Sequence, residues 1–181
     1  MLTCRHHLDG RLDTDYGVGG YVIIENPGNH RYQFNALTVL PRDKLILAGE
    51  DLRTSRRVAI VAVIDQNGKL DDSFNGGGIL ELPAPRESGA AYAVSYRLTT
   101  NLALQYYVGI SYMGGGVEVA RLNSDGELDR HFGNNGWADL GDLTHLWSLQ
   151  HVLQDESGAL VSTIGRTEEA GWKFHVLKLT V

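Results

Sequence analysis

Short apolar segments recur along the chain, and none of them has the spacing of an amphipathic helix. Val58–Asp65 reads VAIVAVID, Val117–Asn123 reads VEVARLN, and Phe174–Val181 reads FHVLKLTV. Each segment alternates between apolar and polar positions or is apolar over a short length, and β-branched residues are frequent, as in strands. Because Gly, Asn and Asp residues separate these segments, the pattern predicts an all-β protein with tight turns.

One string of eleven residues occurs three times, beginning at Gly10, Gly68 and Gly126, with a constant spacing of 58 residues. The copies read GRLDTDYGVGG, GKLDDSFNGGG and GELDRHFGNNG. Besides the first glycine they share a leucine, an aspartate, an aromatic residue and a closing glycine. These shared positions are Leu12, Asp13, Tyr16 and Gly20; Leu70, Asp71, Phe74 and Gly78; and Leu128, Asp129, Phe132 and Gly136. A constant period of this length indicates repeated structural units.

The residue types predict that each copy is a loop, which we call the first (residues 10–20), second (68–78) and third (126–136) corner loop. An Asp-Gly or Asn-Gly pair at its start supplies the positive φ of a tight turn. The leucine and the aromatic ring are expected to pack inward, and the aspartate to accept backbone N–H bonds within the loop. The closing glycine is expected to let the backbone approach the neighbouring unit closely.

Short apolar segments between the corner loops predict four strands in each repeat. The first unit takes Ala36–Leu40, Leu45–Gly49, Val58–Ile64 and Gly78–Leu82; the second takes Ala93–Arg97, Leu102–Gly109, Val117–Leu122 and Gly136–Leu140; the third takes Leu149–Leu153, Leu160–Gly165 and Phe174–Leu179. The strand that the third unit lacks has its counterpart at Gly20–Glu25. Repeated four-stranded units of this kind are typical of the blades of a β-propeller.

The corner loops, with ALTVLPRDKLILAG before the second and VARLNSDG before the third, resemble the delta-60 repeat family of bacterial β-propellers. The resemblance extends from Leu8 to Val181. It implies a tandem structural repeat of the kind found in larger bacterial proteins, many of them surface-exposed. It implies no particular activity.

Three units are too few to close a propeller, which usually has about 4 to 8 blades. We therefore expect a head-to-tail homodimer with a six-bladed ring, in which Gly20–Glu25 completes the third unit of the partner. A larger ring and an origin as a fragment of a larger protein are alternative interpretations. Residues 1–8 lack the apolar alternation of the other third strands, so we expect this stub to be poorly ordered or outside the sheets, and residues 9–181 to form a single domain.

Composition and charge narrow the class of partner. The 181 residues have a net charge of −6, and their 16 Lys and Arg residues are dispersed, which argues against a nucleic-acid partner. No apolar stretch is long enough for a membrane span or a signal peptide, which predicts a cytoplasmic protein without a membrane partner. The family resemblance implies an extracellular alternative. Cys4 is the one cysteine, so an internal disulfide is excluded.

Candidate chemistry is sparse in this sequence. No nucleophile motif or phosphate loop occurs, and the seven histidines lack the spacing of a metal motif, so we expect no metal and no cofactor. His6 and His7 could bind a metal only if the N-terminus is ordered. The aspartates Asp13, Asp71 and Asp129 recur in every corner loop, which favours a structural role, because a catalytic residue is usually needed once.

A binding site in a propeller is expected at the axial channel, where the innermost strands converge. The candidates there are Asn35, Thr38, Arg42, Ser95, Arg97, Gln150 and His151. The favoured hypothesis is a non-enzymatic binding or scaffolding module whose ligand or protein partner the sequence does not identify. The alternative is a hydrolase- or lyase-like enzyme with its site in the channel, which is an analogy from fold to function.

Overall fold

The computed structural model describes residues 2–53, 57–82, 93–100, 105–112, 116–140, 146–154, 160–168 and 171–179. These residues form antiparallel sheets joined by turns, and the regular helical structure among them is limited to two short 3-10 turns at Pro41–Asp43 and Asn75–Gly77. The prediction of an all-β protein is therefore confirmed.

The three larger sheets each contain strands that follow in chain order. The first sheet contains β3 (Tyr32–Val39), β4 (Leu45–Asp51), β5 (Val58–Ile64) and β6 (Leu80–Glu81); the second contains β7 (Ala93–Thr100), β8 (Tyr106–Tyr112), β9 (Val117–Leu122) and β10 (Trp137–Asp139); the third contains β11 (Leu146–Gln154), β12 (Leu160–Glu168) and β13 (Gly171–Leu179). The bounds of β5 and β9 coincide with those predicted, whereas β3 begins four residues earlier than predicted.

The N-terminal stub differs from our expectation. Leu2–Cys4 forms β1, which pairs with β2 (Tyr21–Ile23) in a two-stranded sheet that we call the N-terminal pair. The expectation that residues 1–8 lie outside the sheets was therefore wrong for β1. The physical reason is that ladder hydrogen bonds come from the backbone and do not require alternating apolar side chains, so β2 can pair with a segment that lacks this alternation. β2 thus has a partner strand within its own chain.

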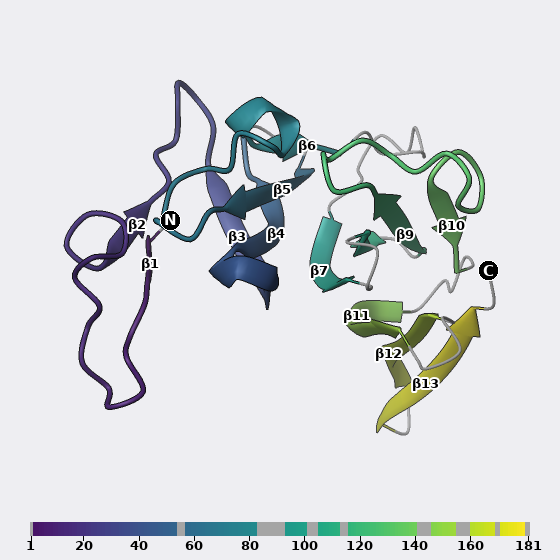
Figure 1. Cartoon of the computed structure of the whole chain (residues 1–181). Helices are drawn as coiled ribbons and strands as arrows, with labels where there is room; N and C mark the ends of the chain where they lie inside the picture. The colour runs from purple at the N-terminus through teal and green to yellow at the C-terminus, as the bar shows by residue number, and fades with distance from the viewer. Residues whose placement is uncertain are drawn as a thin grey trace.

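The sheets follow one another along an open arc, from the N-terminal pair beside the N-terminus to the third sheet beside the C-terminus (Figure 1). The innermost strands lie beside one another, β3 next to β7 and β7 next to β11. The described residues of this single chain do not close into a ring.

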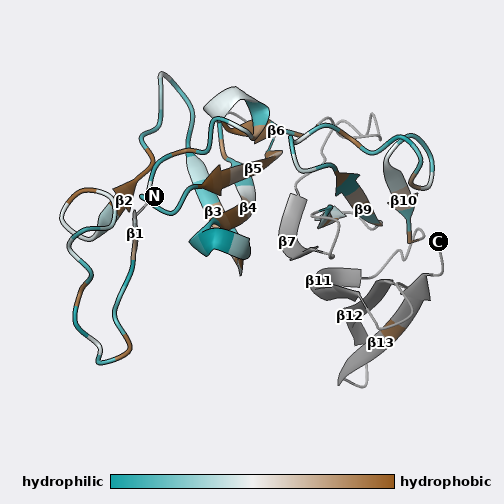
Figure 2. Ribbon diagram, in the orientation of Figure 1, coloured by the Kyte–Doolittle hydropathy of each residue, from teal (hydrophilic) through white to brown (hydrophobic). Residues whose placement is uncertain are grey.

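Two hydrophobic clusters hold consecutive sheets together. The larger one joins the first and second sheets, with Ile46 and Val61 on one side and Val108 and Trp137 on the other. The smaller one joins the N-terminal pair to the first sheet, through Val22, Tyr16, Leu47 and Ile64, among others. Figure 2 shows β5, which contributes to both clusters, in the colours of hydrophobic residues. Burial on both faces explains why β5 reads as a continuous apolar run.

Candidate functional site

The recurring aspartate of each corner loop is buried and holds the loop in place. The side-chain Oδ1 atoms accept backbone N–H bonds from the residue two positions on, at 3.2 Å in Asp13, 2.9 Å in Asp71 and 3.1 Å in Asp129. Each carboxylate also faces a basic side chain: Arg5 at 2.7 Å from Asp13, Lys44 on Asp71, and Arg121 at 2.8 Å from Asp129. The predicted N–H contacts are confirmed, and the arrangement is that of a structural anchor.

The other recurring positions of the corner loops largely follow the prediction. Tyr16, Phe74 and Phe132 are at most 1 % exposed, and the starting glycines have φ between +82° and +94°. The closing glycines differ from it, and a Cβ on Gly78 would lie 3.3 Å from the carbonyl oxygen of Asn75 in its own loop. A Cβ on Gly20 would lie 2.6 Å from Leu12, and one on Gly136 would lie 3.0 Å from Leu128, both in the same loop. Gly20 and Gly136 therefore allow the loop to close on its own leucine rather than on a neighbouring unit.

Consecutive corner loops are linked by backbone hydrogen bonds. The N–H of Gly17 in the first loop donates to the carbonyl of Asn67 at 2.9 Å, just before the second loop. The N–H of Asn75 in the second loop donates to the carbonyl of Asp125 at 2.8 Å, just before the third. Because Gly17 and Asn75 occupy the same repeat position, as do Asn67 and Asp125, the bond is a repeating connection between units.

The predicted channel residues lie on or next to the innermost strands, but their side chains are not gathered into one site among the described residues. Asn35 is exposed at a register irregularity of β3 between Phe34 and Ala36, whereas Thr38 is half-buried in the regular part of the strand. Arg42 is exposed in the turn after β3, with φ of 62°. The remaining candidates lie on β7 and β11, where the side chains are outside the described residues: Ser95, Arg97, Gln150 and His151.

A polar cluster at one end of the first sheet was missed by the sequence analysis. His30 Nδ1 lies 2.6 Å from Asp51 Oδ2, the Nε of Arg53 lies 3.0 Å from the same oxygen, and Arg53 also pairs with Glu81. Asp51 is fully buried. Burial alone would raise its pKa, but N–H bonds from Arg31, His30 and Arg53 outweigh that effect and lower it.

This cluster is best explained as a structural network of ion pairs that connects neighbouring strands. Among the described residues, His30, Asp51 and Glu81 are the one group with three potential metal-ligand atoms within 4.8 Å of one another. The guanidinium of Arg53 contacts both carboxylates and already supplies the positive charge that a cation would bring. His30, Asp51 and Glu81 are far apart in sequence and belong to no motif, so no sequence signal could have identified the cluster.

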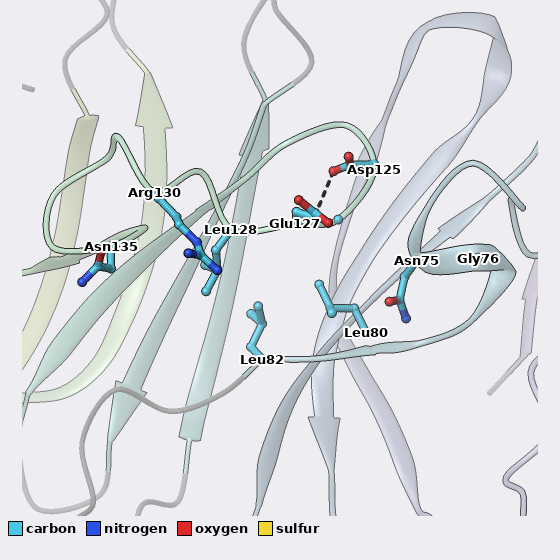
Figure 3. A pocket seen from close by; sticks show the side chains of 10 residues that line it. Asn75, Gly76, Leu80, Leu82, Asp125, Glu127, Leu128, Arg130 and Asn135 are labelled. Carbon is cyan, nitrogen blue, oxygen red and sulfur yellow. Dashed lines mark hydrogen bonds between the residues drawn. The ribbon is translucent and has the colours of Figure 1, made fainter.

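A pocket of about 860 Å³ lies between the second and third corner loops. In Figure 3, the apolar side chains of Leu80, Leu82 and Leu128 come together at the centre of the view, with Glu127 and Arg130 beside them. The peptide N–H of Glu127 donates to Asp125 Oδ1 at 3.0 Å and orders the rim. Residues 83–92, directly after Leu82, lie outside the described residues, so the pocket does not define a ligand.

Comparison with models of known protein families finds no family that matches the chain, and comparison with curated proteins finds no match. None of the described residues belongs to a helix with the length and apolar character needed to cross a bilayer. The assignment of a function therefore depends on the repeat geometry.

Proposed function

We propose that the protein is a non-enzymatic β-propeller module of the delta-60 type, which serves as a scaffold by joining a second copy of itself head to tail. Two chains together supply six units, within the range in which propellers close. The ring would place β3, β7 and β11 of both copies around the axis. The adjacency of these strands in one chain supports this arrangement.

The repeating bond between corner loops carries the proposal. Two links, from Gly17 to Asn67 and from Asn75 to Asp125, join three loops. The next donor in the series is the N–H of Gly133, and the preceding acceptor is the carbonyl of Asp9. Neither group has a hydrogen-bond partner among the described residues. A second copy would bring this donor and this acceptor together and continue the series.

The oligomeric state tests the proposal. At micromolar concentration, light scattering on the full chain is expected to give a mass near twice 19.9 kDa. Removing residues 1–26 takes away the N-terminal pair and the first corner loop, and is expected to return the mass of a single, shortened chain. Circular dichroism on both samples checks that they remain folded. A well-folded full-length monomer at these concentrations would contradict the proposal.

A further inference from the structure

We infer that β2 and the first corner loop form the surface that docks the third sheet of a second copy, and that β1 leaves β2 so that β13 of that copy takes its place. This inference rests on the head-to-tail assembly proposed above. It specifies the surface at which the two copies meet and the strand that is displaced.

The N-terminal pair has the register of the outer two strands of a complete sheet. Cys4 pairs with Tyr21 in the N-terminal pair, and Ala120 pairs with Trp137 between β9 and β10 of the second sheet. Cys4 and Ala120 are 116 residues apart, and so are Tyr21 and Trp137, which is twice the repeat period. β1 therefore occupies the place of a third strand and β2 that of a fourth, while the first two strands of such a sheet are missing from the pair.

Apolar side chains are exposed on β2 and its loop where the other units are polar or covered. Tyr21 is 39 % exposed, whereas its counterpart Trp137 is 8 % exposed and lies in the cluster between the first and second sheets. Ile23 and Val18 are 65 % and 82 % exposed. At the position of Ile23 the other units have Glu81 and Asp139, and at the position of Val18 they have Gly76 and Asn134. A group of exposed apolar side chains of this kind indicates a contact surface.

On β1 and in the residues after it, exposed side chains occupy positions that are buried in the other units. Cys4 is exposed where the other units have the fully buried Ala62 and Ala120. His6 is exposed where they have the fully buried Ile64 and Leu122. In an assembled sheet these positions would face a neighbouring sheet, and a histidine is poorly suited to it. β2 thus carries the apolar surface of a docked strand, whereas the segment after β1 has a histidine at a position that is apolar in the other units.

The third sheet presents the complementary edge. Its last strand, β13, holds the third-strand position, pairs with β12 through nine residues, and has no strand beyond it among the described residues. β1 holds the same position in the N-terminal pair through three residues. A four-stranded unit has room for one third strand, so joining the third sheet to β2 requires one to leave. The shorter β1, which pairs through three residues rather than nine, is the one that costs less to release.

The decisive variant lacks residues 2–4 and keeps Arg5. Arg5 forms an ion pair with Asp13 in the first corner loop, and its guanidinium lies over the ring of Tyr16. Without its competitor, β2 is expected to bind the second copy more tightly, with a dimer dissociation constant lowered by about threefold or more, measured by sedimentation. Tyr21→Asp is expected to raise that constant by about tenfold or more. Val39→Asp, which charges an exposed apolar position of β3, is the matched control.

Cys4 provides an independent readout because it is the one thiol in the chain. If β1 is released, the Cys4 thiol in the dimer is expected to react with a thiol reagent at least as fast as in the diluted monomer. If β1 stayed in place, Cys4 would occupy the buried position of Ala120 and would be protected.

The outcomes separate the two proposals. A dimer in which Cys4 is protected, in which loss of residues 2–4 weakens association, or in which Tyr21→Asp behaves like Val39→Asp would overturn the inference and leave the proposed assembly standing. A chain that stays monomeric in every test would overturn both.

Discussion

Tyr16 shows at the residue scale how a repeat position differs between copies. Its ring is 1 % exposed, like those of Phe74 and Phe132 at the same position. Its hydroxyl is buried and has no hydrogen-bond partner among the described residues. Burial raises the pKa of this hydroxyl above its ordinary value. A buried hydroxyl without a partner costs free energy that a phenylalanine does not.

We therefore expect Tyr16→Phe to stabilise the fold, with a gain of about 1 kcal/mol in the free energy of unfolding. The reverse change at the matched position, Phe132→Tyr, is expected to destabilise it by a similar amount. Urea denaturation followed by circular dichroism measures both. A loss of stability in Tyr16→Phe would show that the hydroxyl has a favourable interaction in the folded state.

At the scale of elements, the aspartate of the second corner loop ties that loop to the start of β4. Asp71 pairs with Lys44, the residue before β4, and accepts hydrogen bonds from the N–H and the hydroxyl of Ser73 at 2.9 and 2.6 Å. Burial acts to raise the pKa of Asp71, but the contacts with Lys44 and Ser73 outweigh it and lower the pKa. The loop and the sheet are therefore coupled through a charged group.

The sign of the pH dependence follows from this lowered pKa. The carboxylate of Asp71 contributes stability above the unfolded pKa of about 3.9, and that contribution is lost as the pH falls through the lower folded pKa. Asp71→Asn is expected to lower the free energy of unfolding at pH 7 by about 1–3 kcal/mol. As the pH is lowered from 5, the free energy of unfolding of the variant is expected to fall less than that of the parent protein.

Asp72→Asn is the control, because Asp72 is the exposed neighbour of Asp71 in the same loop. Denaturation at several pH values compares the two variants with the parent protein. Equal losses of stability at pH 7 in both variants would contradict the role assigned to Asp71.

At the scale of the whole molecule, an interior strand and an edge strand differ in how many of their backbone groups are paired within the chain. β5 lies inside the first sheet between β4 and β6, and most of its side chains are buried. β13 forms an edge of the third sheet among the described residues. An exposed edge presents unpaired backbone groups that another strand can use.

Amide hydrogen exchange should therefore depend on protein concentration in one strand and not in the other. In the proposed dimer, the outer-edge amides of β13 pair with β2 of the second copy, so their exchange is expected to slow as the concentration rises. Exchange in β5 is expected to stay slow at all concentrations. Mass spectrometry of peptides from both strands measures this, and an unchanged rate in β13 across the dimerisation range would argue against pairing at this edge.

The sequence by itself determined the repeated unit. The turn glycines and the N–H contacts of Asp71 depend on residues close together in the chain, and a local requirement recurs wherever the motif recurs. The strands β5 and β9 were predicted at their observed bounds for the same reason, because their apolar runs are bounded by turn residues.

Only the tertiary structure decided which distant groups meet. Pairing of β1 with β2 could not be predicted from the side chains of β1, because ladder bonds come from the backbone. The contact of Asp51 with His30, and the bonds between successive corner loops, join residues that no local pattern connects. The sequence determines local conformation through φ preferences and alternation, whereas the choice of partners depends on how the sheets stack in space.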